Sequence, residues 1–294
     1  MIVDVNLCIS EESDMKKLSF RETQLGAYEI LKFIDRVCRE QGIQYFLMYG
    51  SLIGAIRNKG IIPWDDDIDV MMPRPDYDRF MDYCKKNQEI ISPFKLFEKT
   101  LVPDYPHPIA RMSDMRYHIV FENEKDYGIG LFVDIYPLDG VGNDIGKARA
   151  LVHASYRNAS LCFLTSRKKF GVDNTATKLR LLAKIPAYIW ARIMGNEHYC
   201  NKSKKLCLRY SYSESRYVSG VAQPWREKKK ENKNIYDKEW FEPIEAQFED
   251  GIFYIPKNYD KILTMGYGDY MTPLPENQRH THHTYDTYER EGNL

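Results

Sequence analysis

The first strong pattern in the chain predicts an amphipathic helix between about Ser19 and Gly42. Apolar side chains return every three or four residues along this stretch, which places them on one face of a helix. These positions are Leu25, Tyr28, Ile30, Leu31, Ile34 and Val37. Gly42 follows the last of them and is a typical helix terminator. We therefore expect a helix that ends at Gly42 and packs on a core through its apolar side.

A series of short elements is predicted after this helix. Residues 45–49 are apolar and aromatic, as in a buried strand, and this strand stops at the Gly50-Ser51 turn. Residues 52–58 are expected to form one or two helical turns, closed by Lys59-Gly60 with the glycine in the left-handed conformation. A second strand is expected over 67–71, ended by Pro73 and Pro75. The predicted order is strand, turn, short helix, strand.

The composition is that of an ordinary soluble globular protein, with 43% hydrophobic and 29% charged residues in a chain of 294. This length fits one large domain or two small ones. The six cysteines form no Cys-x-x-Cys pair, which argues against a structural zinc site or a disulfide framework and favours reduced thiols. The first residues, MIVDVNLCISEESD, lack the basic and apolar regions of a secretory signal. A cytoplasmic location is therefore expected.

The formal net charge of zero conceals a basic middle segment. Residues 141–235 hold 20 Lys and Arg against 6 Asp and Glu, a local balance of +14. Such a segment favours contact with phosphates, an anionic glycan or a membrane surface. The alternative is a solvated helical face rich in lysine. Because the whole chain is neutral, no nucleic acid partner is expected.

The most unusual feature is an acidic run, Asp65, Asp66, Asp67 and Asp69, set between apolar stretches. Carboxylates this close raise one another's pKa and repel, so a folded site that holds them needs a cation or open solvent. Alternate residues of a strand share a face, so Asp67 and Asp69 are expected to point to the same side. This face would form a site for a divalent metal.

Two neighbouring features extend this metal site toward phosphate. Gly50-Ser51 open onto a helix N-terminus, where free N–H groups and the helix dipole favour an anion, and Gly50 lets the backbone approach closely. Asp134, inside the apolar run LFVDIYPLDG, is expected to supply a third carboxylate from a neighbouring strand, because a buried aspartate needs a partner. The expected site therefore places a metal beside a phosphate cradle.

The acidic run also resembles two other kinds of metal-binding sequence. Its first residues fit the start of an EF-hand loop, but Val70 stands where glycine is required and Asp76 where glutamate is required. Glycosyltransferases that use sugar nucleotides also bind metal through an Asp-x-Asp pair, and the pair alone does not exclude them. The Gly-Ser turn upstream is the feature that favours a phosphate-transferring site.

Four sequence blocks, in this order, resemble the LicD family of phosphotransferases. They are GSLIGAIR (50–57), GIIPWDDDID (60–69), VDIYPLDG (133–140) and YGDYM (267–271) continuing to Pro275, Arg279, His282 and His283. The resemblance covers about 19–140 and 241–283, and it leaves the basic middle segment without a motif.

The resemblance implies a nucleotidyltransferase-like fold of the α/β (α+β) class, with a mixed sheet core flanked by helices. It divides the chain into a catalytic core, 19–140 and 236–294, and a basic, mainly helical insertion, 141–235. The implied reaction transfers a phospho-substituent, most often phosphocholine, from a CDP-linked donor to a hydroxyl of a cell-surface glycan, with release of CMP. The glycan would be lipopolysaccharide, teichoic acid or a capsule precursor, in free or lipid-linked form. The fukutin-related proteins are similar over the same core and use CDP-ribitol.

By the same resemblance, Asp67, Asp69 and Asp134 bind Mg2+, with Mn2+ as the alternative ion, and Gly50 and Ser51 hold donor phosphate. Asp134 is also a candidate for the base that takes the acceptor proton. Other expected substrate-binding residues are Arg57, Trp64, Arg111, Tyr136, Arg279, His282 and His283.

These further residues have competing interpretations. Arg111 either meets the second phosphate of the donor or forms a surface pair with Asp114. The histidines contact phosphate or line the site as proton donors, since their spacing matches no standard zinc site. Trp64 and Tyr136 either stack on a base, face a quaternary ammonium group, or belong to the core.

The segment 177–194 combines apolar and basic residues in a pattern typical of a helix that lies on an anionic bilayer. Charges and Pro186 prevent it from spanning one. A helical insertion that covers the site is the alternative. Other functions left open are transfer of a phosphonate or another phospho-alditol, glycosyl or nucleotidyl transfer, and non-catalytic metal binding.

Overall fold

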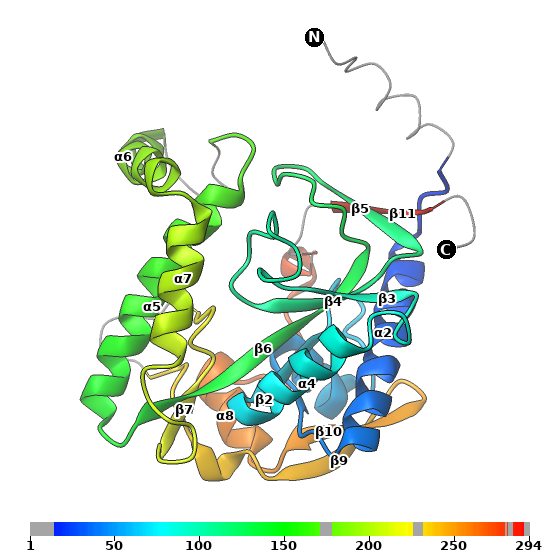
Figure 1. Cartoon of the computed structure of the whole chain (residues 1–294). Helices are drawn as coiled ribbons and strands as arrows, with labels where there is room; N and C mark the ends of the chain where they lie inside the picture. Colours follow the sequence, from blue (N-terminus) through cyan, green and yellow to red (C-terminus); the bar gives the residue numbers. More distant parts are fainter. Residues whose placement is uncertain (1–14, 171–177, 226–231, 280, 282–284, 291–294) are drawn as a thin grey trace.

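A mixed β-sheet forms the centre of the computed structural model, which describes residues 15–170, 178–225, 232–279, 281 and 285–290 (Figure 1). Its strand order is β1 (Phe46–Leu47), β2 (Asp69–Pro73), β6 (Leu131–Gly142), β4 (Ala110–Asp114), β3 (Phe94–Phe97). β7 (Tyr217–Ser219) pairs with β6, and β8 (Tyr236–Asp237) pairs with β7. Only β2 and β6 run parallel among these pairs. The mixed sheet of the expected nucleotidyltransferase-like fold is thereby confirmed.

Helices and two small sheets surround this sheet. The helices are α2 (Phe20–Gln41), α3 (Tyr49–Ile53), α4 (Arg74–Lys86), α5 (Ile145–Ser166), α6 (Lys178–Met194), α7 (Asn196–Cys207) and α8 (Tyr259–Tyr267). β9 (Pro243–Phe248) and β10 (Gly251–Pro256) form a hairpin, and β5 (Tyr117–Phe121) pairs with β11 (Tyr285–Glu289). Single 3-10 turns lie at Lys238–Trp240 and Glu276–Gln278. In Figure 1, α4 crosses in front of the sheet and α8 lies behind it.

The predicted first helix is confirmed as α2. The Ser19 hydroxyl accepts from the Glu22 amide, and the Glu22 carboxylate accepts from the Ser19 amide, which closes a capping box. Gly42 ends the helix with a φ of 59°, in the left-handed region where glycine is unstrained. Leu25 was expected on the apolar face and is instead 43% exposed.

The short helix after the first strand differs from its prediction. It begins at Tyr49 rather than after the Gly50-Ser51 pair, so both residues lie in its first turn. It continues as a π-helix over Gly54–Asn58, and the residue in the left-handed conformation is Lys59, with a φ of 58°, instead of Gly60.

The strand that was expected to carry both Asp67 and Asp69 begins only at Asp69. Asp67 lies in the preceding irregular segment, so the alternation of side chains along a strand does not relate the two carboxylates, and that prediction was wrong. Pro73 is the last residue of β2 instead of lying beyond it, and α4 starts at the next residue.

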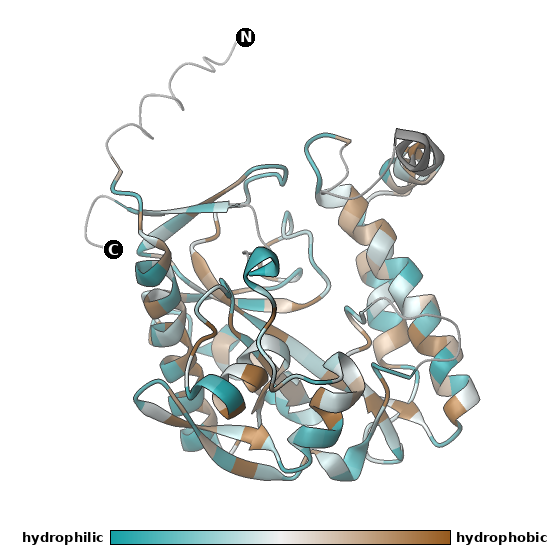
Figure 2. Ribbon diagram, turned by 180° about the vertical axis from the view of Figure 1, so that it is seen from behind, coloured by the Kyte–Doolittle hydropathy of each residue, from teal (hydrophilic) through white to brown (hydrophobic). Residues whose placement is uncertain are grey.

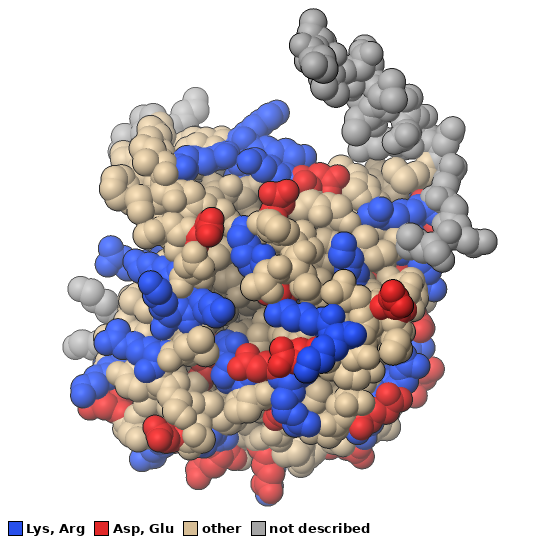
Figure 3. All heavy atoms as spheres, in the orientation of Figure 1, with Lys and Arg blue, Asp and Glu red and all other residues tan. Residues whose placement is uncertain are grey.

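The basic segment 141–235 contributes an arm of helices and also a strand. α5 and α7 pack side by side, and α6 contacts both at the end of the arm that lies away from the sheet (Figures 1 and 2). Lys and Arg gather on the side of the molecule formed by α5 and α7 (Figure 3). β7 of the same segment pairs with β6 of the central sheet, so this segment also contributes a strand to the core. No helix within the described residues has the length and apolar character needed to cross a membrane.

Candidate active site

A cavity of about 440 Å3 lies where the acidic segment, α3 and α8 meet. Seven of its lining residues are glycine or carry a polar or charged side chain without a ring: Gly50, Arg57, Asp65, Asp67, Asp69, Asp269 and Thr272. The others are apolar or aromatic: Tyr49, Ile53, Ile62, Trp64, Tyr136, Trp225, Tyr267, Tyr270 and Leu274. Asp67 and Asp69 therefore share a cavity, although the predicted strand does not bring them together.

Three charged residues lie at one level across neighbouring strands. Asp69 of β2 is in register with Asp134 of β6, and Asp134 is in register with Arg111 of β4. Residues in register on adjacent strands point to the same face of a sheet. The expected third carboxylate is thereby placed beside Asp69.

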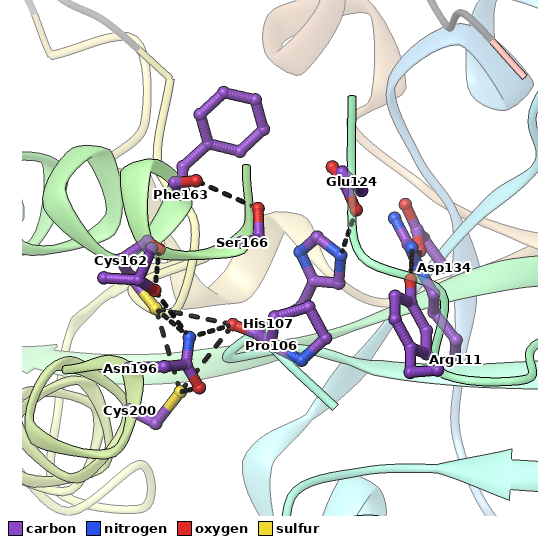
Figure 4. A network of polar contacts seen from close by, with 12 residues as sticks. Pro106, His107, Arg111, Glu124, Asp134, Cys162, Phe163, Ser166, Asn196 and Cys200 are labelled. Carbon is purple, nitrogen blue, oxygen red and sulfur yellow. Dashed lines mark hydrogen bonds and ion pairs between the residues drawn. The ribbon is translucent and has the colours of Figure 1, made fainter. Parts of the chain in front are cut away.

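Arg111 binds this third carboxylate directly. Its Nε donates to Asp134 Oδ1 at 2.6 Å, its Nη1 donates to the Tyr127 hydroxyl at 3.0 Å, and its guanidinium lies 3.9 Å from the Phe132 ring centroid. Figure 4 shows the Arg111–Asp134 pair. The expected surface pair with Asp114 is wrong, because Asp114 is bound by Arg116 and Arg111 is buried.

Asp69 is a buried carboxylate with an unsatisfied oxygen. The residue is 6% exposed, and its Oδ1 has no hydrogen-bond partner in the structure. Burial raises the pKa of Asp69 well above its usual range, and the charges of Asp67, Asp134 and Asp65 raise it further, against the opposing charge of Arg111. Such a carboxylate is stabilised by a bound cation.

The other three acids of the run lie together. One carboxylate oxygen of each of Asp65, Asp66 and Asp67 falls within 4.8 Å of the others. Carboxylate oxygens are the ligands that Mg2+ and Mn2+ prefer. With the unsatisfied oxygen of Asp69 nearby, this donor set fits a hard divalent cation.

Gly50 brings the helix backbone against this acidic cluster. A Cβ atom at this position would collide with the carboxylate of Asp65, so the close approach requires glycine. The preceding Tyr49 has a φ of 55°, an unusual value for a residue with a side chain. The Ser51 hydroxyl accepts from the Asp69 amide at 2.9 Å and does not line the cavity, so its side chain fixes β2 instead of facing a ligand.

Two guanidinium groups surround the indole ring of Trp64. Arg57 lies 5.9 Å and Arg279 4.9 Å from its ring centroid. Arg57 also donates from Nη1 to the Tyr270 carbonyl at 2.9 Å. Desolvation and the neighbouring charge of Arg279 lower the pKa of Arg57. Arg57 and Arg279 come from distant parts of the chain, and together they form a positively charged end of the site beside the carboxylates.

The site also contains residues that the sequence analysis did not assign. Tyr49, Trp225, Tyr267 and Asp269 line the cavity beside the predicted Tyr136. Two of them belong to the YGDYM block, which was recognised but not assigned to the site. Trp225 belongs to the basic segment and had no motif. His282 and His283 lie outside the described residues.

A polar network fastens the helical arm to the segment beside Arg111. Asn196 Nδ2 of α7 donates to the Pro106 carbonyl at 2.8 Å, and the next residue, His107, contacts Glu124 at 3.2 Å (Figure 4). In the same network the Cys162 and Cys200 sulfurs lie 3.7 Å apart. The cysteines within the described part of the chain are free and buried.

Comparison with known proteins identifies the family of this chain. Residues 42–166 match the family described as LicD/FKTN/FKRP, nucleotidyltransferase domain. The chain is 32% identical over 280 residues to the lipopolysaccharide cholinephosphotransferase LicD of Haemophilus influenzae, covering 93% of this chain and 99% of that protein. An uncharacterized protein of Rickettsia typhi is 28% identical over 44% of this chain and 39% of its own length. One of Rickettsia prowazekii is 24% identical over 40% of this chain and 42% of its own. The extent of the match to the Haemophilus protein shows that this chain belongs to the LicD family.

Proposed function

We propose that this protein transfers phosphocholine from CDP-choline to a hydroxyl group of a cell-surface glycan, with lipopolysaccharide as the first acceptor to test, and releases CMP. The observation that carries the proposal is a single cavity that combines Asp65, Asp67 and Asp69 with a positive end at Arg57. This pairing suits a diphosphate bound through a metal. The named activity of the Haemophilus relative supports the choice of head group.

The acidic residues fit a resident Mg2+ ion, with Mn2+ as the alternative. Asp67 and Asp69 would hold it, because both line the cavity and Asp69 Oδ1 lacks a partner. Asp65 and Asp66 lie beside Asp67, and Asp134 stands next to Asp69 in the sheet. When bound, the metal would neutralise negative charge on the donor phosphates.

The side chains and backbone of the site then position the donor. Arg57 and Arg279 attract its negative charge, and Gly50 allows the backbone N–H groups of the first turn of α3 to approach a phosphate oxygen. The acceptor oxygen attacks the distal phosphorus, the bond from phosphorus to the CMP oxygen breaks, and the acceptor proton passes to a base.

The structure favours a positioning role for Asp134 over the base role. Its Oδ1 accepts the hydrogen bond from Arg111, the residue is 4% exposed, and it does not line the cavity. A base must reach the acceptor hydroxyl within hydrogen-bond distance. We therefore assign proton transfer to a carboxylate that lines the cavity and does not hold the metal.

Thermal unfolding with a panel of nucleotides tests the donor. A ligand at about one hundred times its Kd should add about 2.7 kcal/mol and raise the Tm by about 4 °C, given reversible unfolding. We expect a magnesium-dependent shift with CDP-choline. A larger Tm shift with CDP-ethanolamine, CDP-ribitol or a CMP-linked phosphonate would assign that compound's head group to the donor in place of choline. A shift only with UDP-glucose or CTP would replace the proposal by glycosyl or nucleotidyl transfer.

Product analysis tests the transfer itself. CDP-choline labelled in the choline group, incubated with the enzyme, Mg2+ and lipopolysaccharide that lacks phosphocholine, should yield labelled glycan and CMP in equal amounts. Asp67→Asn and Asp69→Asn should yield neither. Release of CMP without labelled glycan would contradict this acceptor and require teichoic acid or capsule precursors to be tested.

A cytoplasmic location remains a prediction.

A further inference from the structure

Four aromatic side chains form one wall of the cavity, which we call the aromatic wall: Tyr49, Tyr136, Trp225 and Tyr267. The ring centroids of Tyr49 and Trp225 lie 4.8 Å apart, and those of Trp225 and Tyr267 lie 4.9 Å apart. Tyr49 also meets Tyr136 edge to face at 5.2 Å. The rings come from α3, β6, the segment before residue 226 and α8, so the fold assembles this wall from four distant parts of the chain.

Trp225 of the aromatic wall is held in place by a buried side chain. The Trp225 amide donates to Asn234 Oδ1 at 2.9 Å, and Asn234 Nδ2 donates back to the Trp225 carbonyl at 3.1 Å. Asn234 is only 3% exposed. The backbone at Gly266 lies close to the Trp225 ring, since a Cβ atom there would lie 3.4 Å from it, at van der Waals contact. The buried amide of Asn234 therefore fixes Trp225 against the cavity at two backbone atoms.

The charges around the aromatic wall differ from those around Trp64. The Trp64 ring already faces the guanidinium groups of Arg57 and Arg279, which would repel a cationic ligand. Among the described residues, no Lys or Arg lies over any of the four rings of the aromatic wall. The cavity thus has one aromatic region that its own cations occupy and another that they leave to a ligand.

A carboxylate outside the acidic run accompanies the aromatic wall. Asp269, two residues after Tyr267, lines the same cavity. It accepts from the Thr272 amide at 3.2 Å and from the Thr272 hydroxyl at 2.7 Å, which holds it in place. Its charge adds to the negative potential of Asp65, Asp67 and Asp69.

We propose that the aromatic wall, with Asp269 as the nearby negative charge, binds the quaternary ammonium group of the donor. This inference rests on the proposed function and assigns its head group to specific residues. A quaternary ammonium cannot donate hydrogen bonds, so it is recognised by the faces of aromatic rings and by negative charge. The ring planes meet at 83° between Trp225 and Tyr267, at 76° between Tyr49 and Tyr136 and at 35° between Tyr49 and Trp225. None of these pairs offers the parallel faces between which a flat base stacks, whereas a rounded cation can contact tilted faces.

Calorimetric titration of the wild-type protein with Mg2+ separates charge from shape. The ligands are CDP-choline, its uncharged isostere CDP-3,3-dimethylbutanol, in which carbon replaces the nitrogen, and CDP. We expect CDP-choline to bind about tenfold more tightly than the isostere, as a cation–π contact in a desolvated site predicts. Equal affinity for both would overturn the ammonium assignment while leaving the transfer proposal in place. Binding of CDP without any gain from choline would have the same meaning.

Variants then assign the preference to the wall. Trp225→Leu should weaken CDP-choline binding about tenfold and change CDP binding less than twofold, and Trp225→Phe should retain most of the preference. Trp240→Leu is the matched control, because Trp240 does not line the cavity. An equal loss for CDP and CDP-choline in Trp225→Leu would place the nucleotide base on this ring and overturn the proposal. If wild-type protein binds CTP or UDP-glucose but no CDP-linked ligand, the result contradicts the proposed function itself. The ammonium assignment, which rests on that function, is then contradicted as well.

Discussion

The Arg111 guanidinium and the Asp134 carboxylate form a buried ion pair, with Nε and Oδ1 at 2.6 Å, one strand away from Asp69. Removing one partner of such a pair leaves a buried charge without compensation. Arg111→Met should therefore lower the free energy of unfolding by about 3 kcal/mol or more, measured by urea denaturation. Arg111→Met combined with Asp134→Asn should recover much of this loss, because the uncompensated charge is gone.

A surface pair provides the control for this prediction. Arg216 binds Asp237 at 3.0 Å, but its side chain is 66% exposed. Arg216→Met should change the free energy of unfolding by less than about 1 kcal/mol. If Arg111→Met were no more destabilising than Arg216→Met, the buried pair would not stabilise the fold around Asp134.

The buried carboxylate of Asp69 should lower the stability of the metal-free protein and be required for turnover. Without metal, Asp69 is buried among negative charges, so Asp69→Asn should remove repulsion and raise the Tm in EDTA by about 2 °C. The same variant should lose turnover and most of the stabilisation that Mg2+ gives to the wild type. Asp82→Asn, on the exposed side of α4, is the control and should change neither quantity. Near-normal turnover in Asp69→Asn would contradict its assignment to the metal.

Local patterns in the sequence predicted part of this site. Helical periodicity located α2, and the apolar run around Asp134 correctly indicated a strand next to the acidic residues. The prediction that Asp67 and Asp69 share a strand face failed because β2 starts at Asp69, yet both residues line one cavity, with Asp67 in the irregular segment before the strand. Strand boundaries are weakly encoded when apolar and acidic residues mix.

Contacts between distant segments explain what the sequence did not reveal. Arg279 reaches Trp64 across more than two hundred residues of chain, and Trp225 enters the cavity from a segment that carries no motif. The pairing of Arg111 with Asp134 depends on the strand order β2, β6, β4, which no local pattern contains. Such placement follows from tertiary packing, so only the structure showed it.

Buried His107 should make the stability depend on pH. Burial and the charge of Arg111 lower the pKa of His107 below its usual 6.5, so the folded state favours the neutral ring. The stability this provides is present above pH 6.5 and is lost as the pH falls, because the unfolded chain binds the proton more readily. We expect the free energy of unfolding to fall between pH 6.5 and 5 by as much as about 1.4 kcal/mol per pH unit from this group.

Variants isolate the contribution of this histidine. His107→Gln should flatten the pH dependence between pH 6.5 and 5, whereas His198→Gln, at an exposed position of α7, should leave it unchanged. Burial opposes ionisation of the partner Glu124, but the hydrogen bond and charge of His107 and the charges of Arg111 and Arg167 lower its pKa to about 2. Its contribution is therefore present above about pH 4.5 and is lost as the pH approaches 2. Identical slopes in wild type and His107→Gln would contradict this assignment.

The end of the helical arm is the remaining candidate for membrane contact. Ile189, Trp190 and Ile193 of α6 are 52%, 57% and 71% exposed. Exposed apolar residues on a basic helix favour binding to an anionic bilayer surface. We expect the protein to float with vesicles that contain phosphatidylglycerol and to release as the salt concentration rises, because salt screens the attraction of Lys and Arg for the lipid.

Substitution of two of these residues tests whether α6 provides the contact. Ile189→Asp combined with Ile193→Asp should abolish flotation, because it removes apolar surface and adds negative charge to the helix. Leu208→Asp combined with Ile252→Asp is the matched control, since both residues are exposed apolar side chains outside α6, at 53% and 51%. The control should float like the wild type. Loss of flotation in both double variants would indicate nonspecific adsorption. A wild-type protein that does not float would leave only the interpretation of α6 as part of a helical insertion.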